Sequence, residues 1–441
     1  MTTAEAKLRA DWRPCYPEET GMATAQRNSP FTRVTTLASQ RPVHAAFAWL
    51  HGNPKRMMDW QVDLVAIPGP PFGEHARSAW TCDRFREAGL AHVEIDAIGN
   101  VLGYLPAGNL SADSTGPVVV LSAHIDTVFP ADTPLNPILN DDRLEAPGAC
   151  DNAAGVVGLL AIANALVQAK VELPAALLFL CNVGEEGEGD LRGVRYFYNQ
   201  AALAGRIAAH IVLDGAGADS AVTQALGSRR FLAQITGPGG HSFTDAGTPN
   251  PIAALASALA VLAATELPAE PRTTLNLGTI AGGTSVNSIP ESAQASVDFR
   301  STSADQLLRL EVGLHRAVED AVEAANARAA SASATAPRGQ LAFSIRKIGD
   351  RPAAFLPADS PLLETLRAVD RHLNLRTDQR LGSTDANIPL SLGVPAISMG
   401  AGGQGGGAHT KAEWYSAKDR EAGLKRVLLL TLAMTAWAAE Q

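Results

Sequence analysis

Blocks of apolar residues alternate with polar segments along the chain, and the length of each block predicts a strand or a helix. Three short runs rich in Val, Leu and Ile predict strands buried on both faces, at residues 118–123, 176–183 and 209–213. A longer Ala- and Leu-rich stretch at 153–167 predicts a helix. Buried strands that alternate with helices are typical of an α/β protein with a largely parallel sheet.

Proline and glycine mark the ends of further elements. Asn53-Pro54 predicts the N-cap and first turn of a helix that ends near Ile67, because the PGPP sequence that follows cannot continue it. A second helix at 74–88 is predicted to end at Gly89, a typical C′ glycine. The other elements predicted in this part of the pattern are strands at 92–96, 101–105 and 394–399 and helices at 361–372 and 420–439.

The order of elements changes between about residues 221 and 335. The strands predicted there lie at 231–236, 273–280 and 293–300, and the helices at 252–264 and from Ser303 onward. An Ala- and Ser-rich segment at 324–336 is predicted to lead from the end of the last helix into a linker. This order suits an open α+β domain inserted into the first domain.

A chain of 441 residues exceeds what one hydrophobic core usually holds, so at least two domains are expected. We expect an N-terminal extension at 1–50 and a doubly wound α/β catalytic domain formed by 51–220 and 336–441. The inserted, smaller α+β domain is expected at 221–335.

Composition narrows the classes of function. The formal net charge of −9 provides no basic face for the phosphates of nucleic acid or of an anionic membrane. The four cysteines have no disulfide-like or CxxC spacing, and Cys181 is predicted to be a small buried side chain. The sequence shows no signal peptide and no window as long as a membrane span, so the cytoplasm is the expected location.

Histidines and carboxylates recur where the predicted strands end or a helix begins. The candidate ligands in these places are His124, Asp151, Glu185 or Glu186, Asp214 and His409. Because ligands of doubly wound sheets bind outside the carboxyl ends of the strands, these residues are predicted to converge. Two histidines and three carboxylates suit Zn²⁺, Mn²⁺ or Co²⁺. Five ligands fit two ions about 3.5–4 Å apart that share one carboxylate and one water.

Each of these residues also has a simpler interpretation. Asp151 at the start of a predicted helix could be an N-cap only, favoured there by the helix dipole. The six glycines at 400–407 that precede His409 could belong to a flexible surface loop. The interleaved glutamates and glycines at 184–189 favour a functional interpretation, because repulsion between the carboxylates has a cost and the glycines weaken helix and strand alike.

Asp126 follows His124 at the i+2 position of an extended segment, so the two side chains are expected to share a face. Its carboxylate can accept the ring N–H that a metal-bound histidine leaves free. A lone His-x-Asp sequence is weak evidence and by itself favours a solvated loop, so the metal site is favoured only by the other strand ends.

Seven separated motifs resemble those of one known group of enzymes. They are AHIDTV, GACDNAAG, NVGEEGEGDLRG, VLDGAG, GPGGHSF, GGTSVNSIPESAQASVDFRS and GGGAHTKAEW, in this order along the chain, and the resemblance covers roughly residues 54–440. The group is the di-zinc peptidase and deacylase family that contains carboxypeptidase G, acetylornithine deacetylase, succinyl-diaminopimelate desuccinylase, aminoacylase and peptidase T. The resemblance implies a zinc-peptidase-like catalytic domain with an inserted ferredoxin-like lid or dimerisation domain.

The resemblance also implies roles for the candidate ligands. His124 and Asp214 would hold one ion, Glu186 and His409 the other, and Asp151 would bridge the two. Asp126 would orient His124. Glu185 would be the general base that deprotonates the bridging water, and a peptide-bond kink is implied between Asp151 and Asn152.

Three residues of the inserted domain match positions that the family associates with the substrate. His241 would stabilise the oxyanion, often in the neighbouring subunit's site, which implies a homodimer through the inserted domain. Asn287 and Arg300 would contact polar groups of the substrate, with Arg300 suited to clamp a carboxylate. Arg300 could equally form a structural ion pair.

These observations favour a di-metal hydrolase that cleaves a peptide or N-acyl amino acid bond. A hydrolase of a non-peptide C–N bond, such as an aryl amine or carbamoyl group, would use the same residues. A catalytically inactive binding protein is disfavoured because all five ligands and the base are present. Thiol catalysis by Cys150 would need a histidine partner, and this cysteine more simply precedes Asp151.

Overall fold

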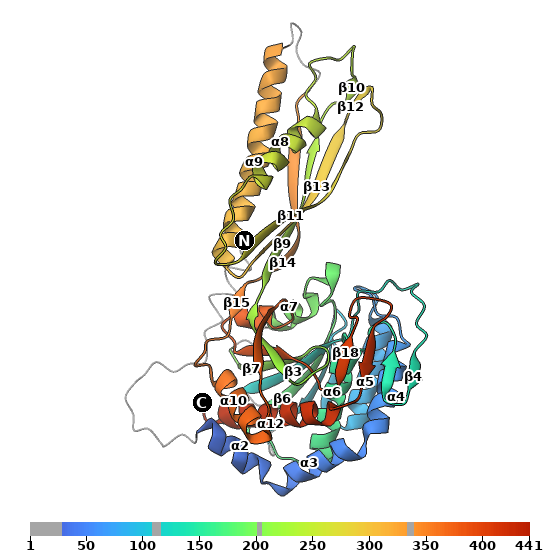
Figure 1. Ribbon diagram of the computed structural model, residues 1–441, viewed down its shortest axis with the longest axis vertical. Helices are drawn as coiled ribbons and strands as arrows, with labels where there is room; N and C mark the ends of the chain where they lie inside the picture. The colour runs from blue at the N-terminus through green and yellow to red at the C-terminus, as the bar shows by residue number, and fades with distance from the viewer. Residues whose placement is uncertain (1–28, 108–115, 201–204, 333–338) are drawn as a thin grey trace, which may run out of the picture. The chain divides into compact units, whose positions relative to one another are not determined.

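The computed structural model describes residues 29–107, 116–200, 205–332 and 339–441. The chain divides into two compact units (Figure 1). One unit holds the described residues up to Ala225 together with Phe355–Gln441, and the other holds those of Leu226–Ala354. The expected boundaries at 220 and 335 differ from this division, because the strand at Ala342–Arg351 pairs within the second unit.

The first unit is built on a nine-stranded mixed sheet. Its strands are β1 (Ala91–Ile95), β2 (Val101–Leu105), β3 (Val118–His124), β6 (Ala176–Asn182), β7 (Ile207–Leu213), β8 (Ser220–Ala225), β15 (Ala354–Phe355), β16 (Asp378–Gly382) and β17 (Ala396–Met399). Their order is β1-β2-β6-β3-β7-β17-β8-β15, with β16 paired to β8. The central strands β6, β3, β7 and β17 run parallel to one another. Their carboxyl ends therefore meet at one edge, as the sequence predicts for a doubly wound sheet.

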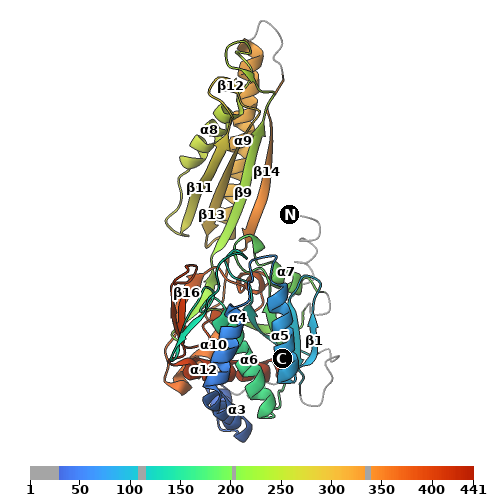
Figure 2. The same cartoon turned by 90° about the vertical axis from the view of Figure 1, so that its right-hand side faces the viewer.

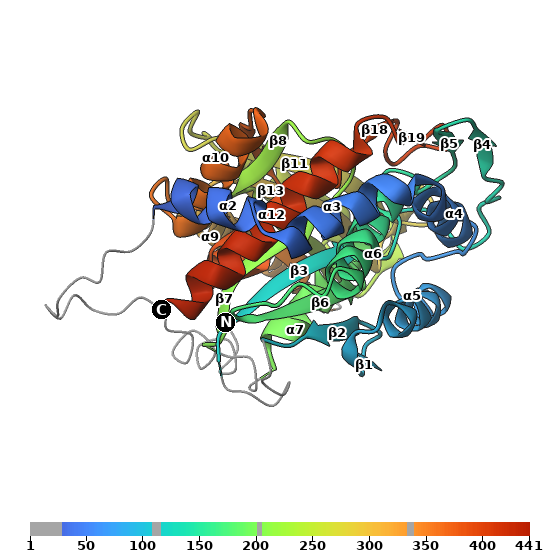
Figure 3. The ribbon, with the colours of Figure 1, turned by 90° about the horizontal axis from the view of Figure 1, so that it is seen from below.

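Helices cover both faces of this sheet, which explains why its central strands are apolar throughout. The helices of the first unit are α2 (Pro30–Ala38), α3 (Arg41–Gly52), α4 (Pro54–Val65), α5 (His75–Ala88), α6 (Ala153–Gln168), α7 (Arg192–Tyr198), α10 (Pro361–Leu373), α11 (Asn387–Ser391) and α12 (Arg420–Ala439), with a short 3-10 turn at Gly187–Gly189. Figure 3 shows α12 and α6 across β3, against which both pack. Val194 and Phe197 of α7 join β3, β6 and the segment around α11 in a second buried cluster. Every residue of β3 and of β7 is buried accordingly.

Two helices precede the first predicted one. Val34 of α2 and Val43 of α3 are fully buried, and α3 packs against α6 and α12. Residues 30–50 are thus an integral part of the first unit, while 1–28 lie outside the described residues. The sequence pattern of α3 has the buried residues Val43, Ala46 and Leu50 on one helical stripe.

Helix α12 corrects the expectation that no window reaches the length of a membrane span. It is 20 residues long and apolar enough to cross a bilayer by length and composition alone. However, 72% of its apolar window is buried inside the protein, as in the core helix of a globular unit. Such a helix is weak evidence for a membrane span.

A small antiparallel sheet lies beside the carboxyl ends of the central strands. Its strands are β4 (Ile138–Asn140), β5 (Arg143–Glu145), β18 (Gln404–Gly406) and β19 (Trp414–Ser416), in the order β18-β19-β5-β4. The hairpin between β18 and β19 carries residues 407–413, and β5 leads directly into residues 146–152. Pairing of Trp414 with Glu145 therefore places these two loops next to each other.

The second unit is a four-stranded antiparallel sheet with two helices on one face (Figure 2). Its strands are β9 (Gly227–Thr236), β11 (Thr273–Gly282), β13 (Ser292–Ser301) and β14 (Ala342–Arg351), in the order β11-β13-β9-β14, with a two-stranded sheet of β10 (Gly240–His241) and β12 (Ser288–Ile289). Helices α8 (Pro251–Ala263) and α9 (Ala304–Ala332) bury the core that includes Phe231 and Phe299. The sequence predicts that the segment at 324–336 runs from a helix end into a linker; α9 continues to Ala332, and residues 333–336 lie outside the described ones.

Candidate metal centre

The site is organised around His124, the last residue of β3, whose side chain is 1% exposed. Its Nδ1 lies 3.2 Å from the main-chain oxygen of Asp126 and 3.5 Å from the Oδ1 atom of the same residue. Its Nε2 lies 3.1 Å from Asp151 Oδ1 and 3.8 Å from Asp214 Oδ1. One ring nitrogen thus faces Asp126, and the other faces two further carboxylates.

Asp126 is fully buried and contacts more than the histidine. Its Oδ1 accepts the N–H of Glu185 at 3.0 Å, and its Oδ2 accepts the N–H of Glu186 at 2.8 Å. Hydrogen bonds from His124 and from these two N–H groups lower the pKa of Asp126, although burial alone would raise it. The carboxylate therefore fixes the end of β3 to the glutamate loop that follows β6.

Asp151 sits in a loop that is fixed by a residue without a predicted role. Glu413 is fully buried, and its carboxylate accepts the N–H groups of Gly148, Cys150 and Asp151 at 2.9, 2.8 and 2.7 Å. The peptide bond between Asp151 and Asn152 is cis, which corresponds to the kink that the resemblance implies.

The interpretation of Asp151 as only an N-cap is wrong. The N-cap of α6 is Asn152, whose Oδ1 accepts the N–H of Gly155 at 3.0 Å. The same oxygen accepts the N–H of Gly215, the residue after Asp214, also at 3.0 Å. Asp151 is thereby left free to face the histidines.

His409 lies in the hairpin between β18 and β19 and is the last member of the cluster along the chain. Its φ is positive, at 64°. Its Nε2 lies 3.0 Å from Asp151 Oδ2 and 3.1 Å from Glu186 Oε1. The glycines before it are held close to other residues: a Cβ on Gly403 would lie 2.1 Å from the Tyr415 hydroxyl, and one on Gly405 would lie 2.3 Å from Cys150 Sγ. The glycine loop is thus closely packed, which disfavours the alternative of a flexible surface loop.

Three groups of side chains have their ligand atoms within 4.8 Å of one another. They are His124 with Glu185 and Glu186, His124 with Asp151 and Asp214, and Asp151 with Glu186 and His409. Asp151 belongs to two of these groups. The structure thus brings together all six residues for which the sequence predicts a metal or general-base role.

Burial and contacts between histidines and carboxylates shift the pKa values of several residues in this cluster. Burial would lower the pKa of His124, but its contacts with Asp126, Asp151 and Asp214 raise the pKa well above 6.5. The hydrogen bond with Asp151 raises the pKa of His409 to about 9. Burial raises the pKa of Glu186 to about 7. Carboxylates gathered at such short distances favour a nearby positive charge, such as that of a divalent ion.

Asp385 is a second residue that sequence reasoning missed. It is fully buried in the loop before α11, its Oδ2 accepts the Asn182 Nδ2–H at 2.7 Å, and its Oδ1 has no hydrogen-bond partner. Burial raises the pKa of Asp385 to about 6, against the nearby positive charge of His124. The segment GSTDAN offers only a lone acidic residue, so the sequence gives no signal beyond its position in a loop.

The residues predicted to contact substrate lie in the second unit. His241 is exposed, and its Nδ1 accepts the N–H groups of Phe243 and Thr244 at 3.2 and 3.3 Å. Asn287 lies close by, because its main-chain oxygen accepts the Ser242 N–H at 2.9 Å. These contacts hold the imidazole in the tautomer whose Nε2 carries the proton, which suits a donor to an oxyanion.

Arg300 and Cys150 have local partners that bear on their alternatives. Arg300 Nε donates to Asp298 Oδ2 at 2.8 Å, as expected for the structural ion pair. Burial raises the pKa of the Cys150 thiol to about 12, so this cysteine is not a thiolate nucleophile at neutral pH. Cys181 is fully buried, as predicted.

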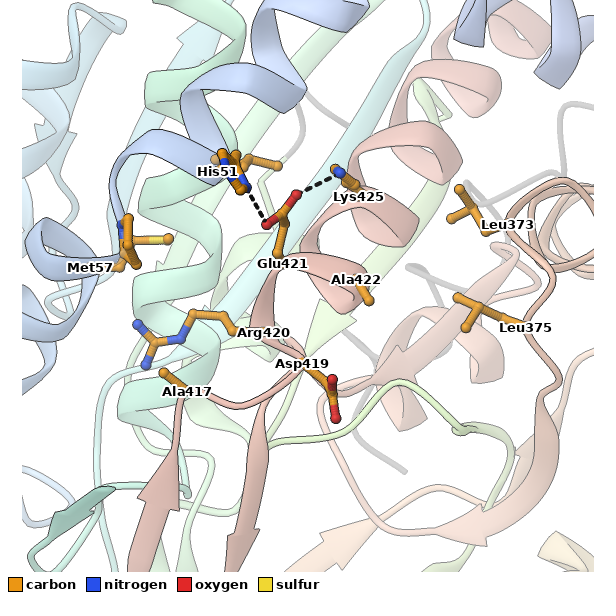
Figure 4. Close-up of a pocket in the computed structure, with 12 residues that line it drawn as sticks. His51, Met57, Leu373, Leu375, Ala417, Asp419, Arg420, Glu421, Ala422 and Lys425 are labelled. Carbon is orange, nitrogen blue, oxygen red and sulfur yellow. Dashed lines mark hydrogen bonds and ion pairs between the residues drawn. The ribbon is translucent and has the colours of Figure 1, made fainter. Parts of the chain in front are cut away.

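A pocket on the first unit lies apart from this cluster (Figure 4). The residues that line it come from α3, α4, the end of α10 and the segment after it, α12 and the segment before α12, and none belongs to the candidate metal site. Figure 4 shows Glu421 between His51 and Lys425, whose nitrogens lie 2.9 and 2.5 Å from its carboxylate oxygens. The carboxylate of Glu421 therefore has a basic side chain on each side.

Comparison with known proteins agrees with the geometry of the cluster. Residues 120–433 match the profile of peptidase family M20/M25/M40. The chain belongs to this family. The matched range contains every residue of the cluster and the sequence of the second unit.

Individual relatives of the family resemble parts or all of the chain. A peptidase M20 domain-containing protein from Sordaria macrospora is 30% identical over 227 residues, which are 47% of this chain and 48% of that protein. The chain thus spans about half the length of this curated relative.

Solved structures of the M20 family show the same fold. Aminopeptidase PepT from Bacillus cereus matches with a TM-score of 0.67 at 19% identity, over 87% of this chain and 99% of that one. A dinuclear metal-binding peptidase of the M20 family from Bacillus subtilis matches with a TM-score of 0.60 at 17% identity, over 87% and 98%.

Proposed function

We propose that this M20-family chain is a metal-dependent hydrolase that cleaves the amide bond of a peptide or N-acyl amino acid. The single observation that carries the proposal is the convergence of His124, Asp151, Glu186, Asp214 and His409 around shared space next to Glu185. Names of relatives support the reaction class, since they include an aminopeptidase and a dinuclear metal-binding peptidase.

The donor set fits two divalent ions, with zinc proposed and manganese or cobalt as the alternatives. Asp151 Oδ1 and Asp214 Oδ1 lie 3.1 and 3.8 Å from His124 Nε2, close enough for the three atoms to bind one ion. We propose that His124 and Asp214 hold one ion and that Glu186 and His409 hold the other. Asp151, which belongs to a group with each histidine, would bridge them.

Bound ions would lower the pKa of a coordinated water from 15.7 to roughly 7 and polarise the scissile carbonyl. Glu185 is proposed to take the proton of the attacking water and to return it to the leaving amine. Asp126 accepts the main-chain N–H of Glu185 and thereby fixes the position of this base. Glu185 is only 5% exposed, so its carboxylate is shielded from bulk water while it carries the proton.

Metal removal tests the function directly. We expect the zinc- or manganese-loaded chain to consume members of a mixed pool of dipeptides, tripeptides and N-acyl amino acids, with products identified by mass spectrometry. The chelated chain should consume none, and added metal should restore turnover. If the loaded chain binds metal but leaves the whole pool intact, a non-peptide C–N bond or a binding function replaces this proposal.

We further propose a homodimer through the second unit, as the resemblance implies. Strand β11 is the edge of its sheet, and Ile280 on this strand is 63% exposed. An exposed edge strand of 10 residues offers a row of N–H and C=O groups to a second copy. Pairing of two such edges would join the two sheets across a twofold axis.

Light scattering after size exclusion tests the dimer. The wild-type mass is expected to be about twice the chain mass of 46.0 kDa. Ile280→Lys should shift the mass toward a single chain, because a charge on an edge strand opposes edge-to-edge pairing. Val312→Lys on α9, where the valine is 49% exposed, is the matched control and should remain dimeric. A wild-type mass of one chain would refute the proposal.

A further inference from the structure

Phe72 has a conformation that its residue type disfavours. It is the third residue of the turn Pro70–Gly73, which the Gly73 N–H closes onto the Pro70 oxygen at 2.8 Å, and its φ is 69°. A positive φ at this position, after proline, fits a type II turn, where glycine or asparagine is usual. A bulky side chain in this region is an outlier, and such outliers concentrate at functional sites.

The ring of Phe72 is exposed yet held in place. Its exposed fraction is 60%, and the guanidinium carbon of Arg192 lies 4.9 Å from the ring centroid. Arg192 Nη2 donates to both carboxylate oxygens of the buried Glu74 at 2.7 Å, and its Nη1 donates to the Ile98 oxygen at 3.1 Å. The cation against the ring is therefore fixed, and 60% of the residue remains exposed for contact with a ligand.

Arg192 also connects Phe72 to the loop of the proposed general base. Its main-chain N–H donates to the Gly184 oxygen at 3.1 Å, and a Cβ on Gly184 would lie 2.5 Å from Arg192 Cγ. Gly184 immediately precedes Glu185. On the other side of the turn, the Thr127 N–H donates to the Gly69 oxygen at 2.8 Å, next to Asp126. The turn that carries Phe72 is thus fixed at both ends to segments that form the metal cluster.

We propose that Phe72 is a specificity-determining residue that contacts an aromatic or branched apolar side chain of the substrate. The proposal rests on the function proposed above and names the class of side chain that its site prefers. A fixed and exposed ring binds apolar and aromatic groups without losing side-chain entropy of its own. The same contact offers nothing to a small polar side chain, so the selectivity should appear as a difference in kcat/KM.

The test compares Phe72→Ala and Phe72→Gly with wild type on metal-loaded protein. Substrates are dipeptides and N-acyl amino acids in matched pairs, one member with Phe or Leu and the other with Ser at the same position. For the apolar members we expect kcat/KM to fall about tenfold, with the Ser members changed less than about twofold. Phe72→Gly should not lower the melting temperature below that of Phe72→Ala, because glycine suits the positive φ. Phe355→Ala, which removes a ring 68% exposed on β15, is the control and should leave both members unchanged.

Each alternative result is decisive. An equal fall for both members of a pair would mean that Phe72 acts through Arg192 on the base, and it would overturn the proposed contact. Wild-type turnover with no loss in either variant would also overturn it. A wild-type chain that turns over no pair would overturn the proposed function and this inference together, so the two failures are distinguishable.

Discussion

Replacing Glu185 by glutamine is expected to abolish hydrolysis while the metal site stays loaded. Glutamine keeps the size of the side chain and the main-chain N–H that Asp126 accepts at 3.0 Å, so the loop should keep its position. It cannot take a proton at neutral pH. General bases contribute about 10²–10⁴-fold, so kcat should fall by about 10³-fold, with KM changed far less.

Glu188→Gln provides the matched control for this variant. Glu188 lies on the same loop and is exposed, and no role is proposed for it. Its replacement should leave both kcat and metal content unchanged, as measured by steady-state kinetics and elemental analysis. Loss of metal in Glu185→Gln would instead make Glu185 a ligand. Its ligand atom lies within 4.8 Å of those of His124 and Glu186, so this role is geometrically feasible. Retained activity would remove it from the mechanism.

The ligands could be predicted from sequence because they follow strands. The parallel order of β6, β3 and β7 brings His124, Glu186 and Asp214 to one edge of the sheet, although they are far apart in the chain. Apolar runs reveal such strands, and the polar residue that ends each run is visible without a structure. The same logic predicted α6, α10 and α12 to within two residues at each end.

The residues that hold the ligands could not be predicted in this way. Glu413 accepts N–H groups from residues 148–151, a contact across more than 260 positions that no local pattern reveals. Asp385 is likewise a single acidic residue in a loop, and its partner Asn182 is the last residue of the distant strand β6. The Pro70-Pro71 pair predicts a turn before α5. It does not predict that Phe72, the next residue, has a positive φ and an exposed ring. Such roles depend on packing between distant segments rather than on periodicity.

Substitution of Glu413 by glutamine is expected to have the second largest effect, through the position of Asp151. The carboxylate accepts three main-chain N–H groups, whereas an amide offers one oxygen and turns an NH₂ group toward the remaining donors. Hydrogen bonds to a charged group contribute about 1.5–3 kcal/mol each, so the free energy of unfolding of the metal-free chain should fall by about 2 kcal/mol or more.

The effect on metal binding separates a positioning role from a structural one. Residues that orient metal ligands typically change affinity or activity by about 10–100-fold, and we expect a loss of this size in apparent metal affinity. Titration with zinc, followed by turnover, should show activity recovering only at higher metal concentration, with KM unchanged at saturation. Glu145→Gln is the matched control, because this partly exposed carboxylate on the adjacent β5 pairs with Arg143 instead.

Glu413 lies only four residues after His409, so a change at Glu413 is expected to affect the positions of both His409 and Asp151. One hairpin supplies both a proposed ligand and the carboxylate that fixes the loop of Asp151, so a shift of this hairpin moves two ligands of the same ion together. Glu413→Gln should therefore weaken the ion held by Glu186 and His409 more than the one held by His124 and Asp214. If the variant loses stability but binds both ions with wild-type affinity, Glu413 serves the fold alone and the geometry of the site is fixed elsewhere.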